Sequence, residues 1–486
     1  MADWETVIGL ECHVELSTET KMFCGCRNGF GAEPNTLTCP VCLGLPGSLP
    51  VPNREAIARI VKIGMALGSE IAPRSLFHRK NYFYPDMPKN YQISQYDLPV
   101  CVGGHLDVEL PDGSTTTVGI TRVHMEEDTG KTSHGSTSGR IHEADSALVD
   151  YNRAGVPLVE CVSEPDMRSP AEAAAYLREL RALLEELDVS DVRMEEGSLR
   201  CDANISVRPA GATELGTKVE IKNMNSVRSL ERALTFETDR QVRALEAEES
   251  LIQETRHWDE DSGTTKTLRS KEEAFDYRYF PEPDIPALEP ERPWVDRIRE
   301  AIPELPAARR ARFRREHADV PGEQVRTLTA SRAFTELFEE AFQRLDGVGA
   351  RTVANWLTQS VAAHLNETGT SVEEVRDRLD AIVRVIELTE DGTVSVTAGK
   401  EVLDEALRED ASPDEIVERR GLRQVSDEGA LGPVVEAVLA ENPEVVEKFR
   451  AGNEGVIGFL VGQVMKASGG SANPKLAQQL LRERLG

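Results

Sequence analysis

The hydrophobic pattern of the chain changes near residue 290. Before that point, short β-rich runs such as residues 6–10, 119–128 and 157–162 predict strands. After it, apolar residues recur at helical spacing and no comparable strand pattern remains. The pattern therefore predicts an α+β first domain followed by all-α segments.

Two long helices are expected within the first domain. Ser169-Pro170-Ala171-Glu172 is a capping box with proline at the first helical position, and an Ala-Leu-rich segment continues from it to Leu187. Residues 226–246 carry the second helical pattern, directly after a predicted strand at residues 218–222.

Prolines between residues 280 and 293 disfavour regular structure and predict the exit from the first domain. Beyond them, the segments with helical periodicity are residues 307–316, 327–345, 352–366, 372–388 and 398–408. A second capping box, Ser412-Pro413-Asp414-Glu415, opens a terminal set of helices. The predicted domains are residues 1–292, a helical linker domain at residues 293–410 and a small helical tail at residues 411–486.

Glu11, His13 and Glu15 alternate at the end of the first predicted strand. Alternate residues of a strand project from one face, so these side chains should share a face. Carboxylates with one imidazole suit Mg²⁺ or Mn²⁺, which an ATP-using enzyme needs to neutralise phosphate charge. Taken alone, the pattern also fits a solvated strand face with a hydrogen-bonded histidine.

Four cysteines follow with the spacing C-x-C, twelve residues, C-P-x-C: Cys24, Cys26, Cys39 and Cys42. Four thiolates at tetrahedral reach predict a structural Zn²⁺ site. The first pair is tighter than the usual C-x₂₋₄-C, which leaves free thiols or a redox pair as alternatives. The remaining cysteines lie scattered in apolar runs and are expected to be buried thiols.

Composition sets the broad class of the protein. A chain of 486 residues that is 40% hydrophobic fits a globular protein of two to four domains. The first residues are acidic without an apolar segment, no stretch reaches the length of a membrane span, and the grouped cysteines suit a reducing compartment. These features predict a cytoplasmic protein.

The formal net charge of -28 ordinarily argues against a nucleic-acid partner. Acidic residues are spread along nearly the whole chain and lysine is much rarer than arginine, as expected of a protein from a halophilic organism. At about 1 M salt the Debye length is only about 3 Å, so local basic patches decide nucleic-acid binding.

Two segments are locally basic. Residues 74–89 interleave Arg and Lys with Tyr82, Phe83 and Tyr84, and the segment from Gly455 onward carries four Lys and Arg side chains. Cationic side chains mixed with aromatic ones can pair phosphates and stack bases. Each patch alone also fits an ordinary charged surface.

Several longer motifs carry a family resemblance, among them His124-Met125-Glu126-Glu127-Asp128 and the segments at residues 7–16, 79–92, 194–204, 276–284 and 458–466. Together they resemble the GatB family, the B-type subunits of the aspartyl/glutamyl-tRNA amidotransferases, over essentially the whole chain. The resemblance implies a glutamine-synthetase-like cradle domain, a helical domain and a tail domain that helps to hold tRNA.

The activity implied by the resemblance is that of an ATP-dependent carbon–nitrogen ligase with glutamine as amido donor. ATP and Mg²⁺ serve to phosphorylate the side-chain carboxylate of Asp-tRNA(Asn) or Glu-tRNA(Gln), and ammonia then displaces the phosphate. The A-type glutaminase subunit supplies the ammonia and a small C-type subunit supports the complex, which implies a heterotrimer. This chain has no cysteine in a convincing glutaminase context, which agrees with ammonia coming from a partner.

Matching the motifs position by position assigns the site residues. The implied Mg²⁺ ligands are Glu11, His13, Glu127 and Glu160. Glu126 and Asp128 are expected nearby. Adjacent strand residues face opposite ways, so Glu126 and Glu127 should not both point at one ion, and Glu127 is preferred over Glu126 as the ligand. Lys80 and Lys89 are implied to serve phosphate or the ammonia path. Further candidates, for cofactor binding or as ordinary polar strand edges, are Arg200, Asp202, Asn204, Lys222 and Asn223.

Two other identities compete with this prediction. The related archaeal E-type subunit carries a large inserted domain, for which this chain has no room. A zinc-containing scaffold that binds tRNA but has lost catalysis is the alternative from another functional class. A scaffold would have no reason to keep Glu11, His13, Glu127 and Glu160 together. The cysteine quartet is not found throughout the family, so the zinc prediction rests on spacing, and the choice between Asp-tRNA and Glu-tRNA stays open.

Overall fold

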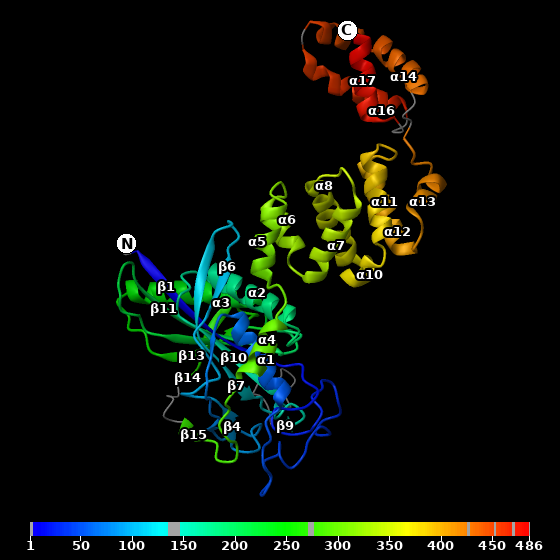
Figure 1. Ribbon diagram of the computed structural model, residues 1–486. Helices are drawn as coiled ribbons and strands as arrows, with labels where there is room; N and C mark the ends of the chain where they lie inside the picture. Colours follow the sequence, from blue (N-terminus) through cyan, green and yellow to red (C-terminus); the bar gives the residue numbers. More distant parts are fainter. Residues whose placement is uncertain are drawn as a thin grey trace. The chain divides into compact units, whose positions relative to one another are not determined.

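The computed structural model describes residues 3–134, 146–270, 277–424, 428–451, 453–468 and 472–485. It divides into two compact units, Met1–Ala307 and Ala308–Gly486. The first unit contains the β-strands together with several helices, and the second is helical (Figure 1). This confirms the predicted α+β domain followed by an all-α region.

Within the described residues the strands are, in chain order, β1 (Trp4–Glu15), β2 (Glu70–Ile71), β3 (His78–Asn81), β4 (Tyr91–Ser94), β5 (Cys101–Val102), β6 (His105–Glu109), β7 (Thr115–Glu127), β8 (Lys131–His134), β9 (Ala147–Asp150), β10 (Pro157–Ser163), β11 (Leu199–Pro209), β12 (Val219–Lys222), β13 (Glu254–Asp259), β14 (Thr264–Ser270) and β15 (Phe280–Pro281).

Over the same ranges the helices are α1 (Arg54–Ala66), α2 (Pro170–Glu186), α3 (Val227–Glu246), α4 (Arg292–Glu300), α5 (Pro306–Glu316), α6 (Gly322–Leu328), α7 (Arg332–Arg344), α8 (Ala350–Asn355), the π-helix η3 (Trp356–Val361), α9 (Ala362–Thr368), α10 (Val372–Arg376), α11 (Leu379–Glu390), α12 (Val396–Glu409), α13 (Pro413–Arg420), α14 (Glu428–Glu441), α15 (Pro443–Arg450), the 3₁₀-helix η4 (Glu454–Val456), α16 (Ile457–Ala467) and α17 (Pro474–Leu485).

A central sheet organises the first unit. Among the described residues it has ten strands in the order β14-β13-β12-β11-β1-β10-β7-β5-β2, with β6 paired to β7 beside this path. β1 lies between β10 and β11 and is antiparallel to both. The register sets His13 opposite Glu160 on one side and opposite Arg200 on the other. Glu160 in turn lies opposite His124 of β7, so a polar row crosses four strands.

The other face of the same strands is apolar. Cys12, Val14, Val159 and Cys201 alternate with the polar row and belong to the main hydrophobic core, which also contains residues of α1, α2 and α3. A strand with period two therefore gives one face to the core and leaves the other for chemistry.

Both long helices of this unit begin at capped ends, of which only the cap at Ser169 was predicted. The Ser169 side chain accepts a hydrogen bond of 3.1 Å from the Glu172 N–H, and the Glu172 carboxylate accepts one of 2.8 Å from the Arg168 N–H. The Ser226 hydroxyl accepts the Ser229 N–H at 3.0 Å. These bonds satisfy N–H groups that have no partner inside the helix.

A smaller sheet, in the order β15-β3-β4, carries part of the basic patch at residues 74–89. Arg79 on β3 holds Glu282, next to β15, through hydrogen bonds of 2.6 and 2.8 Å. The Glu282 side chain is fully buried, so this bidentate pair fastens the proline-rich stretch to β3.

The first unit extends further along the chain than the sequence predicts. Residues after Pro290 form helix α4, in which Pro293 occupies the first turn, where a missing N–H costs nothing. Trp294, Ile298, Ile302 and Leu305 pack against the core of the first unit. The division falls at residue 307, not at residue 292, because these apolar side chains need that core.

The helical unit contains two separate hydrophobic clusters. One draws on residues 313–417 and the other on residues 431–485, so α13 packs with the linker helices and not with the tail predicted from residue 411. The predicted helix at 327–345 is broken at residues 329–331, where Ser331 caps α7 by accepting the Phe334 N–H at 3.2 Å. Ser412 makes no capping hydrogen bond, contrary to the second predicted capping box.

Two more predicted helices differ in detail. Residues 352–366 run through α8, η3 and α9, and residues 372–388 are divided between α10 and α11. In the described parts of the chain, no helix is both long and apolar enough to cross a membrane.

We expect a fragment ending at residue 307 to be more stable than one ending at residue 291. Removing α4 and the segment after it uncovers apolar core surface at about 1 kcal/mol for each partly buried side chain. Thermal unfolding followed by circular dichroism should show a melting temperature at least about 5 °C lower for the shorter fragment. Equal melting temperatures would contradict the boundary at residue 307.

Candidate active site

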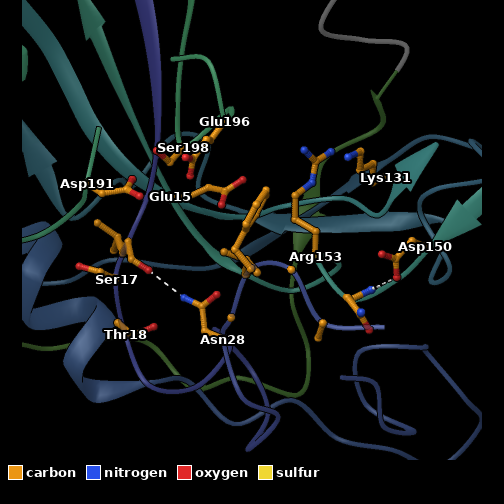
Figure 2. Close-up of a pocket in the computed structure, with 17 residues that line it drawn as sticks. Glu15, Ser17, Thr18, Asn28, Lys131, Asp150, Arg153, Asp191, Glu196 and Ser198 are labelled. Atoms are coloured by element: carbon orange, nitrogen blue, oxygen red, sulfur yellow. Dashed lines mark hydrogen bonds between the residues drawn. The ribbon is translucent and has the colours of Figure 1, made fainter. Parts of the chain in front are cut away.

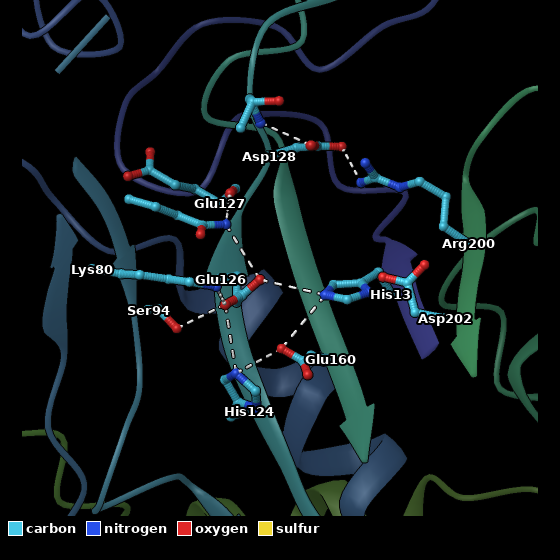
Figure 3. Close-up of polar contacts among 12 residues, drawn as sticks. His13, Lys80, Ser94, His124, Glu126, Glu127, Asp128, Glu160, Arg200 and Asp202 are labelled. Atoms are coloured by element: carbon cyan, nitrogen blue, oxygen red, sulfur yellow. Dashed lines mark hydrogen bonds and ion pairs between the residues drawn. The ribbon is translucent and has the colours of Figure 1, made fainter. Parts of the chain in front are cut away.

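Three metal-ligating side chains converge on the polar face of the central sheet. His13 comes from β1, Glu160 from β10 and Glu126 from β7, and one ligand atom of each lies within 4.8 Å of the others. The His13 Nε2 atom is 3.5 Å from Glu160 Oε2 and 3.8 Å from Glu126 Oε2. Figure 3 shows Glu126 between His13 on one side and Lys80 on the other. We call His13, Glu126 and Glu160 the acidic cluster.

Glu126 is buried but held in its charged form. Burial opposes its ionisation, yet the Lys80 ammonium and His124 bring the pKa of this carboxyl down to about 2. Lys80 Nζ lies 3.8 Å from Glu126 Oε1, and the Ser94 hydroxyl donates to the same oxygen at 2.9 Å. The Gln92 amide donates to Oε2 at 3.2 Å. Burial likewise opposes the charge of Lys80, but Glu126 raises the pKa of its ammonium well above the usual range.

His124 also belongs to this neighbourhood. Its Nε2 atom lies 3.2 Å from Glu160 Oε2 and 3.6 Å from Glu126 Oε1. Burial by itself lowers the pKa of His124, but the charge of Glu160 and hydrogen bonds to both carboxylates raise it to about 9. No role was predicted for His124, although its two-residue spacing from Glu126 on a strand places both side chains on one face.

The donor set of the acidic cluster fits a divalent cation. Two carboxylates and one imidazole are ligands that Mg²⁺ or Mn²⁺ accepts. Although burial opposes ionisation of Glu160, the two histidines hold the pKa of its carboxyl well below the usual value. Burial also acts against a charged His13, and the Glu160 carboxylate overcomes this and raises the pKa of its imidazole. A bound cation would take the place of that proton.

The structure groups the predicted metal ligands differently from the sequence. His13 and Glu160 are brought together, and Glu126 completes the group in place of Glu127. Glu11 lies two residues before His13 on β1 and is not part of this group. Its Oε1 atom accepts a hydrogen bond of 2.8 Å from the Asn204 amide.

Glu127 points away from the acidic cluster, as the alternation of strand residues requires. Its carboxylate forms an ion pair with the Lys89 ammonium and accepts the Ile93 N–H at 2.8 Å. Both partners are nearly buried, with side chains 2% and 7% exposed. Glu126 and Glu127 do face different partners, as expected, but Glu126 is the one that joins His13 and Glu160, contrary to the preference for Glu127. Glu127 and Lys89 thus form an ion pair separate from the acidic cluster, which we call the second charged pair.

The candidates on β11 and β12 have partners of their own. The Lys222 ammonium pairs with Asp202, which lies opposite Glu11 in the sheet. Burial opposes the charge of Lys222, but Asp202 and Glu220 raise the pKa of its ammonium above the usual value. Asn223 has a left-handed backbone conformation and its amide donates to the Trp258 carbonyl at 3.1 Å. These residues border the acidic cluster without joining it.

Arg200 holds Asp128 at the end of β7. Its guanidinium donates to Asp128 Oδ2 at 2.5 Å, and Arg153 Nε lies 3.6 Å from the same oxygen. Burial opposes ionisation of Asp128, but the two arginines lower the pKa of its carboxyl. Burial and the Asp128 charge together raise the pKa of Glu15 to about 8. No role was predicted for Arg153, which lies outside the motifs that carry the family resemblance.

The four predicted zinc ligands do come together. One sulfur atom from each lies within 4.8 Å of the others: Cys24, Cys26, Cys39 and Cys42. Lys21 is fully buried beside them, with Nζ 3.8 Å from Cys42 Sγ and a hydrogen bond of 2.8 Å to the Leu37 carbonyl. A hydrogen bond from Cys24, together with the Lys21 charge, lowers the pKa of the Cys42 thiol to about 5. Four thiol donors with a neighbouring cation fit a Zn²⁺ ion, whose tetrathiolate site is dianionic.

The cysteine loop lies against the second charged pair. A Cβ atom built on Gly44 would come 2.9 Å from the Lys89 Cα atom and 2.5 Å from its Cγ atom. Gly44 also has a φ of +65°, a conformation that residues with side chains rarely adopt. The other cysteines are buried free thiols, as predicted: Cys12, Cys101, Cys161 and Cys201.

A cavity of about 490 Å³ opens next to the acidic cluster on the same face of β1. Glu15 and Ser17 line it from the strand, and residues 28–32 of the cysteine loop form a wall. Figure 2 shows Lys131 and Arg153 toward one end of this cavity and Asp191 toward the other. We call it the loop pocket.

Comparison with known proteins agrees with this geometry. Residues 6–296 match the model of the GatB/GatE catalytic domain, and residues 336–485 match that of the GatB domain. The B-type subunit of aspartyl/glutamyl-tRNA(Asn/Gln) amidotransferase from Halorhodospira halophila is 50% identical over 99% of both chains. The one from Moorella thermoacetica is 50% identical over 99% of this chain and 100% of its own, and the one from Frankia casuarinae is 51% identical over 100% and 96%. The chain belongs to the GatB family, the B-type subunits of the aspartyl/glutamyl-tRNA(Asn/Gln) amidotransferases.

Proposed function

We propose that this protein is the subunit of a tRNA-dependent amidotransferase that activates and amidates the amino acid on Asp-tRNA(Asn), Glu-tRNA(Gln) or both. ATP phosphorylates the side-chain carboxylate, and ammonia from a glutaminase subunit displaces the phosphate. The observation that carries this proposal is the acidic cluster, which lies inside the segment that matches the catalytic-domain model. The A-type and C-type subunits are the proposed partners, in a heterotrimer.

The chemistry requires concentrated charge, because a carboxylate is a poor acyl donor until its oxygen becomes a leaving group. Mg²⁺ held by His13, Glu126 and Glu160 would neutralise charge on the transferring phosphoryl group. The Lys80 ammonium, 3.8 Å from Glu126, would balance a further negative charge at the same place. Binding and orientation of the phosphates, not covalent catalysis by the protein, is the role proposed for these side chains.

The other charged pairs have supporting roles in this proposal. Glu127 and Lys89 would lie on the path of ammonia or of phosphate, as the family resemblance suggests. Arg200, Asp202, Asn204 and Lys222 would border the nucleotide, since they line the same sheet face beside Glu11. The cysteine quartet would hold a structural Zn²⁺ ion that fixes the loop next to Lys89.

A non-catalytic scaffold is not favoured. Glu126 and Glu160 are buried carboxylates in close contact with the buried His124 imidazole. Burying this many ionisable groups is costly, and a protein that only binds tRNA gains nothing from it. The family relatives named above are also amidotransferase subunits, not scaffolds.

Glu126→Gln and Glu160→Gln should each lower turnover by about 100-fold or more, because each removes a charged ligand while keeping its shape. ADP release by the assembled enzyme should be measured with ATP, Mg²⁺ and aminoacyl-tRNA at high salt. Glu70→Gln, at an exposed position on β2, is the matched control and should keep full activity. The Glu126→Gln and Glu160→Gln variants should also need more Mg²⁺ than the unaltered enzyme to reach half of their maximal rate.

Glu127→Gln tests the second pair separately. It should also lower turnover, because it leaves the nearly buried Lys89 ammonium without its carboxylate. Its Mg²⁺ requirement should stay close to that of the unaltered enzyme, since Glu127 faces away from the cluster. If Glu127→Gln releases ADP at the full rate, Glu127 has no part in the chemistry.

Elemental analysis tests the cysteine site. The folded chain should contain about one zinc ion, and Cys39→Ser with Cys42→Ser should contain none. Cys101→Ser is the control, because that thiol is buried elsewhere in the core. Zinc retained by the double variant, or missing from the unaltered chain, would reject this site.

Removing the tail should weaken tRNA binding far more than glutaminase activity. The cut belongs after residue 424, since α13 packs with the linker helices. Lys466, Lys475, Arg482 and Arg484 would be lost, and cations that contact phosphates supply much of the affinity for nucleic acid. Affinity measured at one fixed salt concentration should fall by about tenfold or more. Unchanged affinity would show that the tail does not bind tRNA.

A further inference from the structure

Several features of the loop pocket have no place in the proposed phosphorylation chemistry. No residue of the acidic cluster lines this pocket, and neither does Lys80 or Lys89. Glu15, two residues after His13 on β1, does line it. Glu15 and His13 share a strand face, and two residues along a strand span about 7 Å. The pocket therefore begins about one side-chain length from the cluster.

The wall of the pocket carries an exposed aromatic side chain. Phe30 is 83% exposed and lines the cavity between Gly29 and Gly31. A single exposed aromatic residue on a surface needs no explanation, but one at the wall of a cavity offers a flat face for a ligand ring. Nucleobases are ligands of that kind, because each has a π-face that stacks on aromatic side chains.

The loop that presents Phe30 is fastened at both ends. Asn28 donates to the Leu16 carbonyl at 2.9 Å, which ties the loop to β1. Asn35 accepts the Tyr151 N–H at 2.8 Å through its side chain, and its own N–H donates to Asp150 at 2.9 Å. The backbone on either side of Phe30 is thus fixed before a ligand arrives, which lowers the entropy cost of ordering the loop on binding.

The charges of the pocket distinguish between two sources of a nucleobase. Acidic residues outnumber basic ones in the lining, which includes Asp150, Asp191, Glu196, Lys131 and Arg153. Glu15 also lines the pocket, but its raised pKa leaves it mostly protonated at neutral pH. A nucleoside triphosphate carries about four negative charges and would find no surplus of cations here. The aminoacylated 3′ end of a tRNA brings few phosphates and a cationic α-ammonium group. Figure 2 shows Lys131 and Arg153 toward one end, together with Asp150, and Asp191 toward the other. The Asp150 carboxylate already accepts the Asn35 N–H at 2.9 Å, so the two cations at its end are left for a ligand phosphate.

We infer that the loop pocket receives the terminal adenosine of the aminoacyl-tRNA, with the base stacked on Phe30. This inference rests on the proposed function, and it places the acceptor end of the tRNA in the loop pocket. Lys131 and Arg153 face the phosphate of the last linkage, and the carboxylates face the α-ammonium group. The amino-acid side chain then extends toward the acidic cluster along β1.

Binding of uncharged tRNA tests the base contact directly. With the assembled enzyme, removing the terminal adenosine from the tRNA should weaken binding by about tenfold, since a stacked base contributes about 1–3 kcal/mol. Phe30→Ala should weaken binding of complete tRNA by a similar factor and should make the enzyme insensitive to loss of the adenosine. Phe30→Trp should restore the difference. Additive losses in the double change would show that Phe30 and the adenosine do not meet.

Steady-state kinetics show whether the pocket binds the adenine of the tRNA end or the adenine of ATP. Phe30→Ala should raise KM for aminoacyl-tRNA about tenfold and leave KM for ATP within about twofold. Leu49→Ala is the matched control, because Leu49 is 61% exposed in the same loop region and does not line the pocket. Zinc content and circular dichroism of Phe30→Ala should match those of the unaltered protein, which excludes a general loss of the loop.

The outcomes distinguish this inference from the proposed function. A raised KM for ATP alone would assign the pocket to the nucleotide and overturn the inference. Full activity with unchanged KM values in Phe30→Ala would overturn it as well, while leaving the proposed function intact. If the unaltered assembled enzyme forms no amide on aminoacyl-tRNA, the proposed function itself fails.

Discussion

The antiparallel pairing of β1 with β10 and β11 is the constraint on which the rest of the site depends. It sets His13 opposite Glu160 and Arg200, and β10 carries the same register on to His124 of β7. A shift of one residue in any of these pairs would point the polar side chains of that strand toward the core and its apolar side chains toward the polar face. The helices that cover the apolar face therefore fix the chemistry on the other face, because they allow only one register.

The price of this arrangement is a set of buried charges that must compensate one another. Glu126 and Glu160 stay ionised because Lys80, His124 and His13 surround them. Asp128 depends in the same way on Arg200 and Arg153. Removing one member leaves another charge buried without a partner. This lowers the free energy of unfolding, because the remaining charge has lost its water and has nothing to compensate it. Such a network is rigid and gives its members little freedom to rearrange.

Many residues of this site could be predicted from sequence patterns, but not which of them lie together in the acidic cluster. The two-residue alternation placed His13 on a strand face and separated Glu126 from Glu127, and the cysteine spacing brought the four thiols together. Which glutamate joins His13 depends on the register between β7 and β10, a long-range property that no local pattern contains. Motif matching chose Glu127 and overlooked His124. The domain boundary was misplaced for a similar reason, since the packing of Trp294 on a distant core outweighs the local effect of the prolines.

The close approach of Gly44 to Lys89 has an evolutionary consequence. The gap between the cysteine loop and the charged pair has no room even for a methyl group. Neither position can therefore change by itself. A side chain at position 44 would collide with the Cα and Cγ atoms of Lys89, and a bulkier residue at position 89 would displace the loop. The Gly44 turn and the Glu127–Lys89 pair must therefore be inherited together, so a lineage that has lost the cysteines but kept this pair should still have a glycine at the turn.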